Sequence, residues 1–169
     1  MNALPPVVVM GVSAVGKTSV GIEIARRTGG MFTDADDLHG EANIAKMSAG
    51  IPLDDADRWP WLDRVGEALV PGAVVACSAL KRVYRDVLRR HAPAVAFVHL
   101  DADPDRLLAQ ASGRSAHFMP ASLLRSQLDA LEPLGTDEKG IVVTVDAEPA
   151  ALAARAVAAL TSSPVDSGA

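Results

Sequence analysis

The chain has 169 residues and a mass of 17.6 kDa, which suits one domain with its own core better than two. Sixteen Lys and Arg residues against 21 Asp and Glu residues give a net charge of −5, which argues against a non-specific nucleic-acid binder, because such proteins carry a basic face. Hydrophobic residues make up 49% of the chain, which argues against an intrinsically disordered protein.

Five short apolar runs are the predicted strands, and they lie at 6–10, 31–33, 73–77, 95–100 and 141–145. Helical patterns follow them at 17–28, 42–49, 57–70, 80–91, 104–111, 121–131 and 150–160. Three of the strand runs are almost continuously apolar, which is typical of strands buried on both faces of a parallel sheet. The alternation therefore predicts an α/β fold with right-handed crossovers.

A glycine-rich turn lies between the first strand and the first helix. It reads G-V-S-A-V-G-K-T and matches the phosphate-binding pattern G-x-x-x-x-G-K-[ST] in its required context. Glycines let the backbone curl around an anion, so that N–H groups and the helix N-terminus point at the phosphates. Lys17 would add a charge at the β- and γ-phosphates, and the Thr18 hydroxyl can ligate Mg²⁺. The predicted ATP-binding residues are Gly11, Val12, Ser13, Ala14, Val15, Gly16, Lys17 and Thr18.

The phosphate-binding loop does not identify the acceptor of the phosphoryl group. GTPases also need an N-K-x-D motif to read guanine, and neither Asn2 nor Asn43 begins one. Large ATPase motors need a longer chain. The class that remains is a small P-loop kinase acting on a metabolite or a nucleotide.

Acidic residues follow the second predicted strand, at the sheet edge where open α/β proteins bind ligands. Asp36 is the candidate that would align and deprotonate an acceptor hydroxyl, because phosphoryl transfer depends mainly on positioning. Asp34, nearer the strand, is predicted to hold Mg²⁺ through water. The alternative is a solvated acidic turn that caps the next helix. Asp101, after an apolar strand, is a rival Mg²⁺ carboxylate, and the sequence favours Asp34.

The chain carries no sign of export or of membrane insertion. Cys77 is its single cysteine, so an internal disulfide is excluded, which fits a reducing compartment. No apolar run approaches the ~18 residues that cross a bilayer. The N-terminal apolar run has no basic region before it and continues directly into the glycine-rich turn. We therefore expect a cytoplasmic protein without a membrane or nucleic-acid partner.

Several segments, in order along the chain, resemble the small gluconate kinases (gluconokinases). They read D-A-D-D-L-H at 34–39, N-I-A-K-M at 43–47, G-I-P-L at 50–53, D-R-W-P-W-L at 57–62 and C-S-A-L-K at 77–81. H-F at 117–118 and L-E-P at 131–133 also resemble the family, so the match covers roughly residues 7–146. The D-R-W-P-W-L and C-S-A-L-K segments are far more specific than the phosphate-binding loop.

The resemblance implies a three-layer P-loop kinase fold, in which a five-stranded parallel sheet of order 2-3-1-4-5 carries helices on both faces and a helical lid. It implies Mg²⁺-dependent transfer of the γ-phosphoryl group of ATP to the 6-hydroxyl of D-gluconate in gluconate catabolism, with gluconate and ATP as the partners. A single domain is expected over 1–161, followed by a flexible tail at 162–169. The family is often homodimeric, and the residues leave open the assembly of this chain.

Within that resemblance, four side chains suit an anionic polyol. Arg58 can pair bidentately with the gluconate carboxylate. Lys81 can contact gluconate or offset charge at the transferring group, while His39 and Ser78 offer polar contacts to the sugar hydroxyls. The alternative for each is an ordinary surface or structural role. The neighbouring tryptophans are expected to pack rather than to stack on a sugar.

The resemblance also assigns a lid to residues 104–133, which would close over ATP and exclude water. Arg114 is the candidate cation that follows the γ-phosphate during transfer, and His117 would approach the acceptor. Asp146, after the fifth strand, resembles the adenine-side segment of the family.

The chain departs from the family at Ala14-Val15, where Gly-Ser is usual, and at Gln110, where the lid usually carries an arginine. Three other functions stay open at this point. Shikimate kinase shares the fold but usually has Gly-Gly-Gly at 77–79. A nucleoside-monophosphate kinase would need a base-stacking site and more lid arginines. A non-catalytic nucleotide-binding module is the third, on the strength of Gln110.

Overall fold

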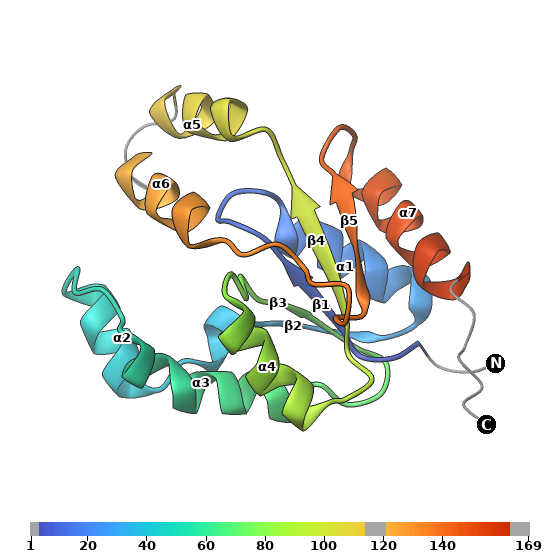
Figure 1. Cartoon of the computed structure of the whole chain (residues 1–169), viewed down its shortest axis with the longest axis horizontal. Coiled ribbons are helices and arrows are strands. Elements are labelled where there is room, and N and C mark those ends of the chain that lie inside the picture. The colour runs from blue at the N-terminus through green and yellow to red at the C-terminus, as the bar shows by residue number, and fades with distance from the viewer. Residues whose placement is uncertain (1–3, 114–120, 163–169) are drawn as a thin grey trace.

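The computed structural model describes residues 4–113 and 121–162, and its core is a parallel sheet between two layers of helices (Figure 1). The strands are β1 (Val7–Met10), β2 (Met31–Asp34), β3 (Ala73–Ala76), β4 (Ala96–Asp101) and β5 (Gly140–Thr144). The helices are α1 (Lys17–Thr28), α2 (Glu41–Ser48), α3 (Asp55–Glu67), α4 (Arg82–His91), α5 (Pro104–Gly113), α6 (Ala121–Ala130) and α7 (Pro149–Ser162). The strands pair in the order β2-β3-β1-β4-β5, which confirms the predicted fold class and strand order.

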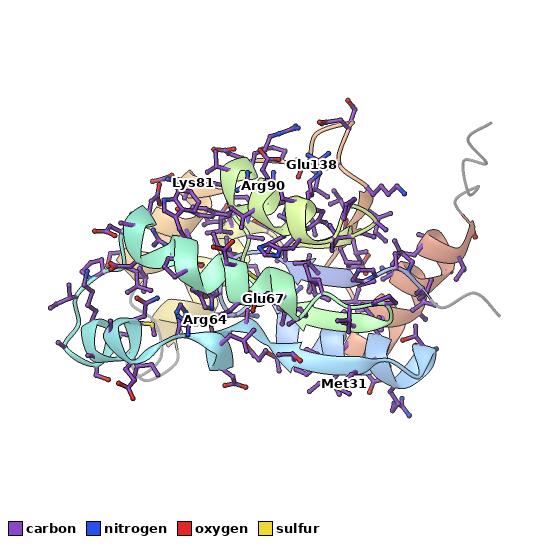
Figure 2. The ribbon with its side chains drawn as sticks, turned by 90° about the horizontal axis from the view of Figure 1, so that it is seen from below. Met31, Arg64, Glu67, Lys81, Arg90 and Glu138 are labelled. Atoms are coloured by element: carbon purple, nitrogen blue, oxygen red, sulfur yellow. The ribbon has the colours of Figure 1, made fainter. Side chains whose placement is uncertain are left out.

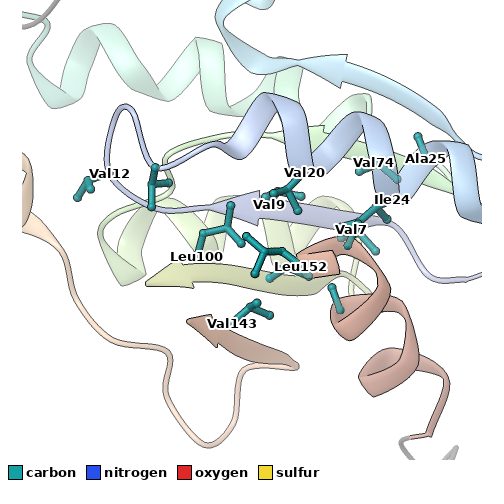
Figure 3. Close-up of a cluster of buried hydrophobic side chains, with 14 of the residues drawn as sticks. Val7, Val9, Val12, Val20, Ile24, Ala25, Val74, Leu100, Val143 and Leu152 are labelled. Atoms are coloured by element: carbon teal, nitrogen blue, oxygen red, sulfur yellow. The ribbon is translucent and has the colours of Figure 1, made fainter. Parts of the chain in front are cut away.

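The central strand β1 is buried on both faces, and its side chains alternate between two apolar clusters. Val8 and Met10 pack with side chains of α3 and α4. Val7 and Val9 pack on the other face with side chains of α1 and α7, including Ile24 (Figure 3). Each buried side chain of this size contributes about 1.5–3 kcal/mol to folding. The continuous valine run is therefore explained by helices covering both faces of the sheet.

The start of α3 is set by a reciprocal pair of aspartates. The Asp54 side chain accepts the Asp57 N–H at 2.8 Å, and the Asp57 side chain accepts the Asp54 N–H at 3.0 Å. The helix consequently begins at Asp55 and ends at Glu67, whereas the sequence predicted 57–70, which is wrong by two and three residues at the two ends. The other predicted strands and helices agree to within two residues.

A short 3₁₀ turn (Ala35–Leu38) that the sequence did not predict follows β2. The Asp34 carboxylate caps it by accepting the Asp36 N–H at 3.0 Å. Asp34 and Asp36 are thereby held in a fixed relation at the carboxyl end of β2, in a turn where Asp36 is exposed.

Helices α5 and α6 lie beyond the carboxyl ends of β1 and β4, away from the two helical layers (Figure 1). They fall within the predicted lid, part of which, 114–120, lies outside the described residues. Helix α7 continues to Ser162, the first residue of the predicted tail, and the rest of that tail is also outside them. None of the helices in the described ranges is long and apolar enough to span a membrane.

One buried ion pair joins α4 to the segment before β5. The side chains of Arg85 and Glu138 are both fully buried, with Nε and Oε2 2.7 Å apart, and Glu138 lies close to α4 (Figure 2). The same guanidinium donates to the carbonyls of Ala79 (2.9 Å), Leu80 (3.2 Å) and Pro133 (3.2 Å). Arg85 therefore holds the loop after β3 against the chain that follows α6.

We predict that Arg85→Met lowers the free energy of unfolding by about 3–5 kcal/mol, because it leaves a buried carboxylate and buried carbonyl groups without their partner. The matched control is Arg89→Met, one turn further along α4, whose pair with Asp86 is partly exposed and contributes about 0–1 kcal/mol. Chemical denaturation of both variants measures the difference. Equal losses of unfolding free energy in the two variants would show that burial does not increase the contribution of Arg85 to stability.

Candidate active site

The loop between β1 and α1 has the curled backbone expected of a phosphate site. Gly11 has φ 144°, and a Cβ there would lie 2.9 Å from the Leu100 carbonyl oxygen. Gly16, at the start of α1, has φ 102°. Both glycines are required, because residues with a Cβ rarely adopt these angles and the space beside Gly11 is filled. The loop thus presents backbone N–H groups ahead of the α1 N-terminus.

The two residues that depart from the family have different roles in this loop. Ala14 takes the left-handed conformation at φ 66°, which costs about 1–2 kcal/mol for a residue with a Cβ. Val15 is buried and belongs to the apolar cluster between the sheet and α1. Because the Val15 side chain packs in the core, the presence of valine where the family usually has serine leaves the backbone N–H donors of the loop in place.

Lys17 and Thr18 meet the acids of β2 at the mouth of the loop. The Lys17 ammonium donates to the Val12 carbonyl at 2.8 Å, and the Thr18 hydroxyl donates to Asp34 at 3.0 Å. Burial lowers the pKa of Lys17, and Cys77 together with the nearby aspartates offsets part of that effect. These contacts gather a cation, a hydroxyl and a carboxylate around one space.

That space is a cavity of about 480 Å³. It brings together predicted residues from the loop, from β2 and from the end of β3, namely Ser13, Ala14, Gly16, Lys17, Thr18, Asp34, Asp36 and Ser78. Asp101, the rival carboxylate, does not line it. The arrangement favours Asp34 over Asp101 as the acid nearest the phosphate-binding loop.

Asp36 combines exposure to this cavity with an environment that disfavours its charge. Burial raises the pKa of Asp36, and the negative charge of Asp34 raises it further. His39 and Lys17 act in the opposite direction. A carboxylate with a raised pKa is a better proton acceptor than an ordinary one, which suits the predicted role of Asp36.

A second cavity, of about 350 Å³, adjoins the first. Four of the residues predicted to bind the acceptor line it, and they are His39, Arg58, Ser78 and Lys81.

The His39 ring stacks on Trp61 with centroids 4.4 Å apart, and its Nδ1 lies 3.2 Å from the Asn43 amide. Burial is the main cause that lowers the pKa of His39, so the ring is neutral near pH 7. Trp61 is itself buried and donates to the Ala35 carbonyl, in agreement with a packing role.

Sequence reasoning missed Tyr84, which lines the second cavity and organises its cations. The Tyr84 hydroxyl donates to Asp55 at 2.6 Å and lies 3.4 Å from the Arg58 guanidinium, which is itself 3.3 Å from Asp55. The Lys81 ammonium lies 5.7 Å from the centre of the Tyr84 ring. The available signal was spacing, since Tyr84 follows Lys81 by three residues at the start of a helix and so lies on the same side of it.

The structure does not bring every predicted site residue to the two cavities. Asp146 lines neither, and its carboxylate pairs with Arg155 of α7 at 2.5 Å. Arg114 and His117 lie outside the described residues. Gln110, at the position of the missing lid arginine, is exposed on α5.

We predict that Tyr84→Phe raises the pKa of Asp55, because the Tyr84 hydrogen bond is the largest of the causes that lower it. The phenyl ring keeps the edge contact with Trp59, whose centroid lies 5.8 Å away, so packing is preserved. The measurement is a ¹³C NMR titration of the aspartate carboxyl groups in both proteins. An Asp55 resonance that titrates at the same pH in both would contradict this hydrogen-bond network.

Comparisons with known proteins identify relatives of this chain. No family model matches the chain. The chain is 46% identical over 141 residues to the thermosensitive gluconokinase of Escherichia coli (strain K12), which covers 80% of this chain and 75% of that protein. The crystal structure of a gluconokinase from Sinorhizobium meliloti 1021 superposes with a TM-score of 0.85 at 46% identity, over 95% of this chain and 94% of that one.

A shikimate kinase from Bacteroides thetaiotaomicron superposes with a TM-score of 0.65 at 18% identity, over 94% of this chain and 99% of that one, and so shares the fold alone. The two gluconokinases, in contrast, are each 46% identical to this chain over 80% or more of its length. With that extent of similarity, the chain belongs to the gluconokinase family.

Proposed function

We propose that the protein transfers the γ-phosphoryl group of ATP to the 6-hydroxyl of D-gluconate. The bond between the γ-phosphorus and the oxygen that bridges it to ADP breaks, and a bond from that phosphorus to the sugar 6-oxygen forms. The hydroxyl proton passes to the Asp36 carboxylate and then to solvent. The products are ADP and 6-phospho-D-gluconate, and the reaction needs no oxidant or reductant.

The observation that carries this proposal is the pair of adjoining cavities with different chemistry. The first is lined by the phosphate-binding loop, and the second carries Arg58 and Lys81 beside hydroxyl and imidazole groups. A guanidinium matches a carboxylate in a bidentate pair, while polar side chains can bond to sugar hydroxyls. A linear sugar acid therefore fits the second cavity, with one end anchored at Arg58 and the other directed to the ATP side.

The residues around Thr18 fit Mg²⁺ bound together with ATP. The Thr18 hydroxyl would be a direct ligand, and the Asp34 carboxylate, 3.0 Å from that hydroxyl, would hold the metal through a bound water. Among the described residues, no group of three or more His, Cys, Asp or Glu side chains could hold a metal alone. Mg²⁺ needs few protein ligands when it keeps water and phosphate oxygens. When bound, it supplies positive charge at the β- and γ-phosphate oxygens.

Residues of the chain itself bind the phosphates, exclude water and contact the adenine. Lys17 neutralises charge on the phosphates, and the loop N–H groups orient them. Residues 104–133 act as the lid that excludes water, with Arg114 following the γ-phosphate and His117 approaching the acceptor. Asp146 is assigned to the adenine side. The buried, unpaired Cys77 supports a cytoplasmic location, where thiols stay reduced.

We predict that the purified protein phosphorylates gluconate in the presence of ATP and Mg²⁺, with kcat/KM for gluconate at least about 100-fold above that for shikimate or AMP. A coupled assay of ADP release over this acceptor panel, with EDTA as the control for metal dependence, measures it. A preference for shikimate or AMP would overturn the proposed acceptor. ATP binding without turnover on any acceptor would point to a non-catalytic module.

We further predict an acid limb in the pH profile of kcat/KM that follows the ionisation of Asp36. Activity rises with pH as Asp36 loses its proton, and Asp36→Asn lowers kcat by about 10²–10⁴-fold. Asp34→Asn also slows the reaction, but it removes a charge that raises the pKa of Asp36, so its remaining activity has the limb at lower pH. Asp63→Asn, on α3 beside His91, is the control, and we expect its acid limb at the same pH as in the wild type. A limb that stays in place in Asp34→Asn would argue against Asp36 as its source.

A further inference from the structure

Helix α6 places one side chain directly on the phosphate-binding loop. The Gln127 side-chain oxygen accepts the Ser13 backbone N–H at 2.7 Å, across 114 residues of sequence. Ser13 is the third residue of the loop motif, whose N–H groups serve to bind phosphate. A neutral side chain from the candidate lid therefore occupies one donor of the loop.

The packing of α6 explains why Gln127 lies on its inner side. Leu124, one turn before, is buried in the apolar cluster beside α1, and Leu128 packs against the same cluster. Positions 124, 127 and 128 share one side of a helix because of its 3.6-residue period. Gln127 is thus a polar residue within an apolar stripe, and its side chain finds its hydrogen-bond partner on the loop.

Gln127 also lies at the boundary between the two cavities. Of the described residues, Gln127 and Ser78 line both. Ser78 belongs to the loop after β3, and its carbonyl accepts the Gly11 N–H at 3.3 Å. A phosphoryl group that passes from the first cavity to the second must cross this boundary.

The carboxamide has chemistry that suits this place. Its oxygen accepts from Ser13, and its NH₂ group provides two donors that carry no net charge. Donors placed where charge develops stabilise phosphoryl transfer when they are held in position beforehand. The contact with Ser13 holds the side chain in this way, and the anchoring leucines fix the helix that carries it.

We propose that Gln127 is a catalytic residue for phosphoryl transfer, held by the Ser13 N–H at the boundary of the cavities and presenting the NH₂ donors of its carboxamide to the transferring group. This inference rests on the proposed kinase function and deepens it. It differs from a purely structural tie between α6 and the loop, because a tie requires only an acceptor for the Ser13 N–H, whereas the proposed role also requires the NH₂ donors of the carboxamide.

The experiment compares Gln127→Ala and Gln127→Glu with the control Asp129→Asn, an exposed site on the same helix. In Gln127→Ala we expect kcat to fall about 10–100-fold, because alignment at the transferring group is lost. The affinity for ADP, measured by calorimetry, should change less than about threefold, because the remaining loop donors still hold the phosphates. Asp129→Asn should match the wild type in both measurements.

Gln127→Glu separates the two roles. Its carboxylate can still accept the Ser13 N–H, and its charge repels the nucleotide phosphates under either role, so a structural tie predicts that kcat and the affinity for ADP fall by the same factor. The proposed role predicts that kcat falls about 100-fold near pH 8, and about tenfold more than the affinity for ADP, because the NH₂ donors to the transferring group are lost as well. The ratio of its rate to that of the wild type should rise as the pH is lowered, because the carboxyl group becomes protonated. Equal losses of kcat and of ADP affinity in Gln127→Glu, or a wild-type kcat in Gln127→Ala, overturn the proposal.

One further readout keeps this test distinct from the test of the proposed function. The Ser13 amide in a ¹⁵N–¹H NMR spectrum should shift in Gln127→Ala and stay near its wild-type position in Asp129→Asn. This signal needs no acceptor and no turnover. If the wild type fails to phosphorylate gluconate, the proposed function fails, and the Ser13 resonance still reports whether the Gln127 contact exists. An unshifted Ser13 resonance in Gln127→Ala overturns the contact itself.

Discussion

The curl of the backbone between Gly11 and Gly16 is the constraint on which the site depends. The loop passes so close to β4 that a side chain at Gly11 would meet the Leu100 carbonyl, and this closeness follows from the central place of β1 between β3 and β4. With the loop fixed there, parallel pairing brings the ends of β2 and β3 to the same edge. Asp34 and Ser78 are consequently set against the loop by the sheet itself.

The second cavity is organised by charge rather than by the sheet. Arg58 lies on α3 and Tyr84 on α4, and Asp55 holds both through hydrogen bonds. Before any ligand binds, Asp55 offsets the charge of Arg58 and keeps the guanidinium beside the cavity. A guanidinium already oriented in this way loses less conformational entropy when it pairs with a carboxylate. The capping aspartates of α3 thus contribute to the site as well as to the fold, since they fix the turn on which Arg58 lies.

Local patterns predicted the features that depend on neighbouring residues in sequence. The valine runs predicted buried strands, the loop motif predicted a phosphate site, and the acids after β2 were recognised as candidate site residues. The order of the strands came from the family resemblance. The contact between Ser13 and Gln127 could not be foreseen, because it joins residues 114 positions apart and depends on how α6 docks. Tyr84 was missed although its spacing from Lys81 was visible, because a tyrosine near the start of a helix is more often a packing residue. The 3₁₀ turn after β2 was not predicted because it is too short to have a periodic pattern.

The anchoring of α6 limits how a lid built on it can move. At the C-terminal end of α6, the Glu132 N–H donates to the Leu80 carbonyl at 2.8 Å, and the Glu132 carboxylate accepts the Arg82 N–H at 2.9 Å. Arg85 adds its hydrogen bond to the Pro133 carbonyl in the buried network with Glu138. These bonds tie the end of the candidate lid to the loop that carries Ser78 and Lys81. The end of α6 is therefore fixed beside the floor of the acceptor cavity, and Gln127, about one turn before that end, is held on the phosphate-binding loop by the same docking.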